Sequence, residues 1–397
     1  MLLTLWFAAV LGICVSAGAQ GSNHTVGAWI AKRRAVKARK LSALVTRVLD
    51  QERSHADAMR DAHFDWSAAH RPDSQFAIFA ISLKDEVGMK GVQGFVGTAR
   101  KAGFAGDIVL ATHPKVHKGI QKYLYAKRVS VYGVDVKCSG KNPTEVCQLP
   151  AEFGAQAVPI AMLRFYIYQW WASLYQPAAV IMLSDFRDVF FQANPFAYKY
   201  YEWRPPEHQL TVFQEFFPNK VISRCGHNRR WIRNCYGAEG LAMVETNTVL
   251  CSGTTFGTRD AVLGYASLML RQLDAKVRLK GDAVDEQEAN DQCYFQGMDQ
   301  GLHNWLVYTG LLDMYMDVKV YQQGEGPVNT VGAFTGKMAT LKRPLRDWGV
   351  LTGEAPQAVV LNWNQEPSPV VHQLDRFQSS EDIKGGYRGT MKAFQDL

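Results

Sequence analysis

The sequence lacks the patterns that mark several common classes of protein. It contains no Cys-x-x-Cys pair and no histidine cluster with zinc-ligand spacing, which argues against a structural zinc site. No Gly-x-Ser-x-Gly motif follows an apolar run, and this disfavours a Ser-His-Asp hydrolase. Internal repeats and low-complexity tracts are also absent, so the chain is neither a solenoid nor a disordered polymer.

Long apolar runs are scarce as well. The one at the N-terminus, residues 2–15, is short for a membrane span and is followed by small residues that end at Ala19, a pattern typical of a secretory signal peptide. No Lys or Arg precedes it, and an uncleaved signal anchor that holds the chain in the membrane is the alternative. Either segment predicts a location in the lumen of the secretory pathway (Golgi or ER), or secretion. Asn23 begins the only clean N-glycosylation acceptor.

Charge is sparse too. Charged residues make up 20% of the 397 residues and apolar residues 47%, which describes a globular protein with a large core. The net charge is only +7, and six of the cations lie together in residues 32–40. Nucleic-acid binding is one interpretation of such a run. In the secretory lumen we favour a solvated helix or a face apposed to the membrane, with no nucleic-acid partner.

Cysteine is rare: the chain has seven, and six of them lie beyond the N-terminal segment. An even number in an oxidising compartment predicts disulfides, and six cysteines allow fifteen connectivities. Short loops are the most economical closures, and they predict the pairs Cys138–Cys147, Cys225–Cys235 and Cys251–Cys293. The second pair would make residues 225–235 a basic, Trp-bearing lid for a diphosphate or an acidic acceptor. A solvated loop is the alternative.

What the chain does contain is a regular alternation of apolar runs and helical segments. Strands are predicted over residues 76–82, 107–111, 129–134, 178–183 and 244–256, and helices over 88–101, 159–175 and 259–279. Residues 198–233 are predicted to be loops, and 318–397 short strands and turns. This alternation predicts an α/β fold with a mostly parallel central sheet flanked by helices. We divide the chain into a signal segment (1–19), a polar helical stem (20–72) and a single large domain (73–397).

Residues 178–196 are the most informative segment. A buried apolar strand ends at Asp185 and Asp188, with Arg187 between them. Ligands of open α/β sheets bind just beyond the carboxyl ends of the strands. Two carboxylates at such a place predict a divalent cation that in turn binds a diphosphate. A turn or a helix cap that pairs with Arg187 is the alternative for either carboxylate.

A further charged residue stands out in the predicted helix 159–175. This helix is apolar on nearly all sides, so it should be buried, yet it contains Arg164. A buried Arg needs an anionic partner. That partner is either a carboxylate of the core or a phosphate or carboxylate of a ligand.

The order of these motifs along residues 76–376 resembles that of the GT-A glycosyltransferases, in particular the glycogenin-like and the plant cell-wall xylosyl- and arabinosyltransferase groups. The resemblance is carried by an Arg-bearing helix, a metal strand, an Asn…Ser-Gly strand, an Asp-Gln…Asn helix and a late His. Here these are Arg164, Asp185-x-x-Asp188, Asn247…Ser252-Gly253, Asp299-Gln300…Asn304 and His372. The resemblance implies a GT-A (Rossmann-like) fold. The metal motif departs from the usual Asp-x-Asp by one additional residue.

The resemblance also implies a role for each residue. Asp185, Asp188 and His372 would hold Mn²⁺ (or Mg²⁺), and the imidazole favours manganese. Contacts with the donor are expected from Ala80, Ile81, Ser82, Arg164, Asp185, Ser252, Gly253 and Asn304. Asp299 and Gln300 are the candidates for catalytic contacts with the reacting sugars.

Plainer interpretations stand beside several of these roles. His372 is otherwise a structural histidine, Ser252-Gly253 an ordinary tight turn, and Asp299 a helix N-cap. Asp291 with Gln292 is a competing Asp-Gln pair.

These features together predict a metal-dependent glycosyltransferase, a hexosyl- or pentosyltransferase that moves a sugar from a UDP- or GDP-sugar to a glycan or glycoprotein. The resembled groups mostly retain the anomeric configuration, and no carboxylate nucleophile stands out, so retention is expected. Inversion would require a general base, for which Asp299 is the candidate. Two other functions are weighed against this one: a catalytically silent carbohydrate-binding protein on the same fold, and a metal-dependent phosphotransferase with Asp185 as the nucleophile.

Overall fold

The computed structural model describes residues 23–53, 61–83, 88–139, 146–148, 157–197, 208–216, 220–278, 293, 297–332, 351–352 and 359–373. The predicted signal segment (1–19) and the competing pair Asp291-Gln292 lie outside the described residues. So does the side chain of Asn23.

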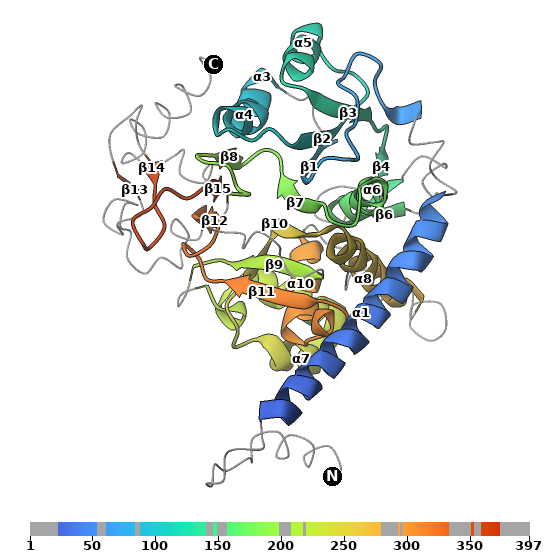
Figure 1. The fold of residues 1–397 in the computed structure, drawn as a ribbon, viewed down its shortest axis with the longest axis vertical. Coiled ribbons are helices and arrows are strands. Elements are labelled where there is room, and N and C mark those ends of the chain that lie inside the picture. Colours follow the sequence, from blue (N-terminus) through green and yellow to red (C-terminus); the bar gives the residue numbers. More distant parts are fainter. Residues whose placement is uncertain are drawn as a thin grey trace.

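A seven-stranded sheet forms the centre of the molecule, with the strand order β11-β9-β10-β7-β1-β2-β3 (Figure 1). Its strands are β1 Phe76–Ser82, β2 Asp107–Thr112, β3 Val129–Gly133, β7 Val180–Asp185, β9 Gln209–Gln214, β10 Leu250–Thr258 and β11 Asp317–Tyr321. The four strands β3, β2, β1 and β7 are mutually parallel, and β11 is parallel to β9. Only β10 runs antiparallel to both of its neighbours, β7 and β9. The predicted α/β fold with a mostly parallel central sheet is confirmed.

Helices cover both faces of this sheet (Figure 1). They are α1 Asn23–Arg53, α3 Met89–Val92, α4 Thr98–Lys101, α5 Lys118–Ala126, α6 Ile160–Leu174, α7 Gly226–Val244, α8 Arg259–Arg278 and α10 Met298–Tyr308, with a π-helical turn, Gln93–Gly97, between α3 and α4. Two cores result, because side chains alternate across a strand. In β1, Ala77 and Phe79 pack with α6 and α8, whereas Ile78 and Ala80 pack with α3, α4 and α5. Because side chains on both faces of β1 are buried, this strand is an unbroken apolar run in the sequence.

Helix α1 occupies the region that we predicted to be a polar stem. Its basic residues 32–40 are mostly exposed, as a solvated helix requires. Its later turns are not polar, because Leu41, Leu44 and Val48 are buried in the core formed with α6 and α8. Part of the expected stem therefore belongs to the packed domain, while the boundary at residue 72 stays a prediction. Among the described residues, no helix has the length and apolar character needed to cross a membrane.

Two further predictions require correction. The disulfide Cys138–Cys147 is confirmed, but Cys235 is bonded to Cys293, and Cys225 and Cys251 are free and buried. Residues 198–233, predicted as loops, contain β9 and the start of α7. The predicted lid over 225–235 is wrong, because Gly226 begins a helix. At a rise of about 1.5 Å per residue the two cysteines are about 15 Å apart along it, well beyond disulfide reach.

A small sheet beside the main sheet determines where His372 lies. A three-stranded sheet has the order β12-β15-β8, formed by β12 Val328–Thr330, β15 Val370–His372 and β8 Val189–Phe191. In the antiparallel pairing of β15 with β8, His372 lies opposite Val189, the residue after Asp188. The remaining short strands are β4 Lys137–Ser139, β5 Val146–Gln148, β6 Ala157–Pro159, β13 Leu351–Thr352 and β14 Val359–Val360.

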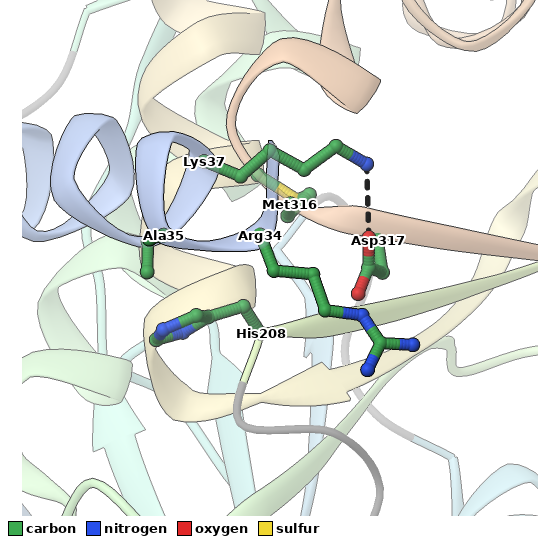
Figure 2. A pocket seen from close by; sticks show the side chains of 7 residues that line it. Arg34, Ala35, Lys37, His208, Met316 and Asp317 are labelled. Atoms are coloured by element: carbon green, nitrogen blue, oxygen red, sulfur yellow. Dashed lines mark hydrogen bonds and ion pairs between the residues drawn. The ribbon is translucent and has the colours of Figure 1, made fainter. Parts of the chain in front are cut away.

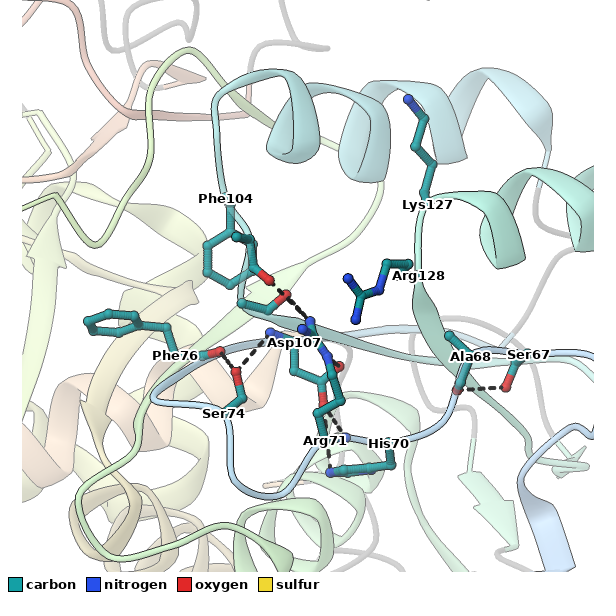
Figure 3. Close-up of polar contacts among 12 residues, drawn as sticks. Ser67, Ala68, His70, Arg71, Ser74, Phe76, Phe104, Asp107, Lys127 and Arg128 are labelled. Carbon is teal, nitrogen blue, oxygen red and sulfur yellow. Dashed lines mark hydrogen bonds and ion pairs between the residues drawn. The ribbon is translucent and has the colours of Figure 1, made fainter.

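A buried charge cluster closes the amino end of the main sheet (Figure 3). Asp107, the first residue of β2, accepts hydrogen bonds from the Arg71 backbone N–H at 3.0 Å and the Tyr175 hydroxyl at 2.6 Å. Arg100 donates to four backbone carbonyls, those of residues 104, 106, 127 and 128. Burial raises the pKa of Asp107, although these donors oppose the shift. Through these contacts Arg71 and Arg100 hold loops to the sheet.

Candidate functional site

The strand order creates a crevice at the carboxyl ends of β1 and β7. The chain proceeds from β1 outward to β2 and β3, and then returns to place β7 on the other side of β1. Ligands of open α/β sheets bind at such a switch point. A cavity of about 250 Å³ lies there, and its lining includes Ile81, Ser82, Arg164, Tyr168 and Asp185. Four of these five were predicted donor contacts.

Ala80 does not line this cavity. Its side chain is fully buried in the core with α3, α4 and α5, because it points to the opposite face of β1 from Ile81. Of the three residues predicted to contact the base and ribose, Ile81 and Ser82 line the cavity, and the role of all three stays a prediction.

The two aspartates and the late histidine converge. Asp185 ends β7, Asp188 precedes β8 and His372 ends β15. His372 Nε2 lies 3.5 Å from Asp185 Oδ2 and 3.6 Å from Asp188 Oδ1. One ligand atom of each residue lies within 4.8 Å of the others. The Asp185 side chain is 37% exposed and that of His372 is 0% exposed, so the cluster opens at its carboxylate side and is closed behind the imidazole.

This donor set fits a divalent cation. His372 Nε2 is buried and makes no hydrogen bond within the described residues, although it faces two carboxylates. Oxygen ligands with one imidazole suit Mn²⁺ better than Mg²⁺. The additional residue of the Asp-x-x-Asp motif does not prevent convergence, because β7 ends at Asp185 and the chain turns before β8 begins.

Gly253 in β10 lies against the same cluster. A Cβ built there would come within 2.9 Å of His372 Nε2 and still closer to Asp185 Oδ2. Contacts this short do not occur in folded proteins, so any side chain would displace the carboxylate or the imidazole. The glycine thus gives these two groups the space that they occupy, rather than forming an ordinary tight turn.

Arg164 connects two carboxylates from different elements. Its Nη1 donates to Asp185 Oδ1 at 2.7 Å, and its Nη2 forms an ion pair with Asp299 of α10. Ser252 completes the contact, because its hydroxyl donates to Asp299 Oδ2 at 2.8 Å and lies 3.3 Å from Arg164 Nη2. The anionic partners expected for this buried Arg are therefore Asp185 and Asp299. The N-cap of α10 is Gly297, so Asp299 is not the helix cap.

These charges stabilise one another. Burial favours the neutral form of Asp185, but His372 and Arg164 favour its anion and lower its pKa to about 2. Burial opposes the charge on His372, yet Cys251, Asp188 and Asp185 raise its pKa well above the usual value. The two carboxylates therefore favour positive charge at this place, and a bound cation would supply it.

The two amides of α10 are committed to other partners. Gln300 Nε2 donates to Glu215 Oε1 at 3.2 Å and Asn228 Oδ1 at 3.3 Å. Asn304 exchanges two hydrogen bonds of 2.8 Å with the backbone of Leu250 and is fully buried. Asn304 therefore positions β10, two residues before Ser252, and its donor contact stays a prediction.

Sequence reasoning missed four residues near the site. Tyr168 lies one turn after Arg164 on the same helical face, a spacing that could have identified it. Glu215, Cys251 and Gln373 gave no such signal, because their partners come from distant parts of the chain.

A second cavity, of about 270 Å³, lies between α1 and the β11 edge of the sheet (Figure 2). Arg34, Lys37, His208 and Asp317 contribute to its lining. Lys37 is paired with Asp317 at 2.9 Å and with Asp313 at 3.4 Å. Two strands, β9 and β10, separate this edge from β7, so the cavity is distinct from the carboxylate site.

Comparisons with known proteins give a structural likeness only. No model of a protein family matches the chain, and no curated protein matches it. One similar solved structure is the galactosyltransferase LgtC in complex with donor and acceptor sugar analogues. It shares 11% of residues, and the alignment covers 81% of this chain and 95% of that chain with a TM-score of 0.41. We rest no conclusion on a likeness of this degree.

Proposed function

We propose that this protein is a metal-dependent glycosyltransferase of the GT-A type, which moves a sugar from a nucleotide-diphosphate donor to a glycan or glycoprotein. The observation that carries the proposal is the convergence of Asp185, Asp188 and His372 beside a cavity at the β1/β7 switch point. Arg164 and Ile81 also line that cavity. A cation site next to a crevice for a base and ribose is the arrangement that a nucleoside diphosphate requires.

A divalent cation held by Asp185, Asp188 and His372 would supply charge neutralisation for the departing diphosphate. The chain's own groups orient the reactants. Ile81 and Ser82, which line the cavity at the end of β1, receive the nucleoside. Arg164 fixes both Asp185 and Asp299, and so couples the metal side of the cavity to the side where we place the sugar.

We propose retention of the anomeric configuration. Asp299 is the candidate base for inversion. Its Oδ2 is paired with Arg164 and accepts a hydrogen bond from the Ser252 hydroxyl. These contacts give Asp299 two structural partners, and no other carboxylate among the described residues stands out as a base. Removal of the acceptor proton by an oxygen of the departing diphosphate needs no further protein base.

The alternatives predict different contacts. A phosphotransferase would need a free oxygen on Asp185, but Oδ1 accepts from Arg164 and Oδ2 faces His372. A silent carbohydrate-binding protein would keep the fold without turnover, and only an assay separates it from an enzyme. The predicted lumenal location and membrane anchoring by residues 1–19 remain part of the proposal.

The testing experiment is a donor screen. The purified protein is incubated with a panel of UDP- and GDP-sugars, with Mn²⁺ or with EDTA, and release of nucleoside diphosphate is measured with and without pooled glycan acceptors. We expect release from one donor that requires the metal. Metal-independent release would contradict the metal dependence of the proposed enzyme. Donor binding without release under all conditions would contradict the proposal and favour the binding protein.

A further inference from the structure

A polar layer lies behind His372, on the side away from the two aspartates. Cys251, in β10, is a free thiol that is only 1% exposed. Its Sγ lies 3.5 Å from Nδ1 of His372, whereas Asp185 and Asp188 face Nε2. Each ring nitrogen of this histidine therefore has a different environment: a sulfur on one side and the carboxylates on the other.

Gln373 holds the thiol and an aspartate at the same time. Its side-chain Nε2 donates to Cys251 Sγ at 3.6 Å, and its backbone N–H donates to the carbonyl of Asp188 at 2.9 Å. The residue has a φ of 63°, in the left-handed region that residues other than glycine rarely adopt. Such a conformation persists where the surroundings fix it, and it is common at functional sites.

The chemistry of a histidine ligand explains the arrangement. An imidazole that offers the Nε2 lone pair to a cation carries its proton on Nδ1. A hydrogen-bond acceptor at Nδ1 fixes this tautomer and the ring orientation. The acceptor is usually a carboxylate, a carbonyl or water. Here the nearest group is the sulfur of Cys251, which also receives the N–H of Gln373.

We propose that Cys251, held by Gln373, is a positioning residue of the metal centre. It accepts the Nδ1–H of His372 and so directs the Nε2 lone pair towards the cation between Asp185 and Asp188. The thiol is available for this role because Cys293, its predicted disulfide partner, is bonded to Cys235. The inference rests on the metal site of the proposed function, and it adds to that site a residue that contacts neither cation nor substrate.

The test is the affinity for Mn²⁺ alone, measured by the electron paramagnetic resonance of free Mn²⁺ with no donor present. Cys251→Val removes the acceptor at nearly constant volume, and Cys251→Ser keeps one. We expect Cys251→Val to weaken Mn²⁺ binding by about 10- to 100-fold, the usual effect of losing such a support. Cys251→Ser should recover most of the affinity. Cys225→Val removes the other free buried thiol and should leave Mn²⁺ binding unchanged.

Equal Mn²⁺ affinity in the wild type and a folded Cys251→Val variant would overturn the inference while leaving the metal site intact. Absence of Mn²⁺ binding in the wild type would overturn the metal site itself, and the inference with it. Should Cys251→Val not fold, the ¹⁵N spectrum of ring-labelled histidine in the Zn²⁺-loaded wild type decides, with His372 assigned by His372→Gln. A proton on Nδ1 supports the inference, and a proton on Nε2 contradicts it.

Discussion

Two clusters of arginine and aspartate lie at opposite ends of the same sheet. At the amino end, Arg100 and Arg71 donate mostly to backbone carbonyls, and Asp107 accepts from a backbone N–H and a tyrosine. At the carboxyl end, Arg164 donates to two carboxylates and a hydroxyl from three different elements. Figure 3 shows the first cluster closed by loops, whereas the second lines a cavity.

The comparison separates structural from functional charge. A guanidinium that donates to backbone carbonyls ties loops together. Carboxylates that converge without backbone donors repel one another and require a cation. The pKa shifts of the two aspartates differ in sign. Burial outweighs the donors and raises the pKa of Asp107, whereas His372 and Arg164 outweigh burial and lower the pKa of Asp185 to about 2.

The largest effect is expected from a substitution that breaks the carboxyl-end cluster. Asp188→Asn removes a charge from the metal site but keeps the side-chain shape. Since metal stabilisation of the leaving group is worth several kcal/mol, we expect sugar transfer to fall by at least about 10³-fold. The midpoint of thermal unfolding should stay nearly unchanged. Unaltered turnover in this variant would remove Asp188 from the metal site.

The matched change at the amino end should have the reverse outcome. Asp107→Ala leaves Arg71 and Tyr175 without their buried partner. Loss of one member of a buried charged network costs about 3 kcal/mol or more in the free energy of unfolding. Urea unfolding measures this cost, and Mn²⁺ affinity is the control that should not change. A loss of Mn²⁺ binding in the folded variant would show that the two ends are coupled.

A smaller effect is expected from Gly253→Ala. The added methyl group would collide with Asp185 and His372, so one of them must move. We expect Mn²⁺ affinity to fall by about 10- to 100-fold, in the range seen when the geometry of metal ligands is disturbed. Gly257→Ala, farther along β10, is the control, because its nearest contacts are longer than 3.1 Å. Equal affinities of the two variants would mean that the cluster adapts freely.

Per pH unit, the smallest effect is the dependence of stability on pH, to which one histidine at each end should contribute. Burial lowers the pKa of His70 to about 3 at the amino end, and burial next to Arg164 lowers that of His303 to about 3. When the pH is below about 6.5, the pKa of histidine in the unfolded chain, each of these histidines binds a proton in the unfolded chain but not in the folded chain. Stability should thus fall by about 1.4 kcal/mol per pH unit for each histidine as the pH decreases from 6.5 towards 3.

Urea unfolding between pH 6 and pH 4.5 measures this slope. His70→Gln and His303→Gln should each remove the contribution of one histidine to the slope of stability against pH. Asp185 does not interfere, because its lowered pKa contributes stability that is lost only below its ordinary value of 3.8, towards 2. A slope that neither substitution changes would show that both histidines are charged in the folded protein.

Local patterns in the sequence predicted the elements that bury both faces. The strand over 76–82 and the helix over 160–174 appear where the apolar runs indicated them. Local patterns did not predict the helix Gly226–Val244, because a short disulfide between Cys225 and Cys235 was expected there. Cysteine pairing depends on contacts between distant residues, so spacing could not decide it.

The sequence by itself determined the α/β class and the presence of Asp185, Asp188, Arg164 and His372, because strand periodicity and charge at a strand end are local properties. Tertiary structure alone decided what each of them contacts. The pairing of β15 with β8 brings His372 to Asp188 across more than 180 residues, and Arg164 meets Asp299 only because α6 and α10 pack together. Register and packing arise from the whole core, and no short pattern carries that information.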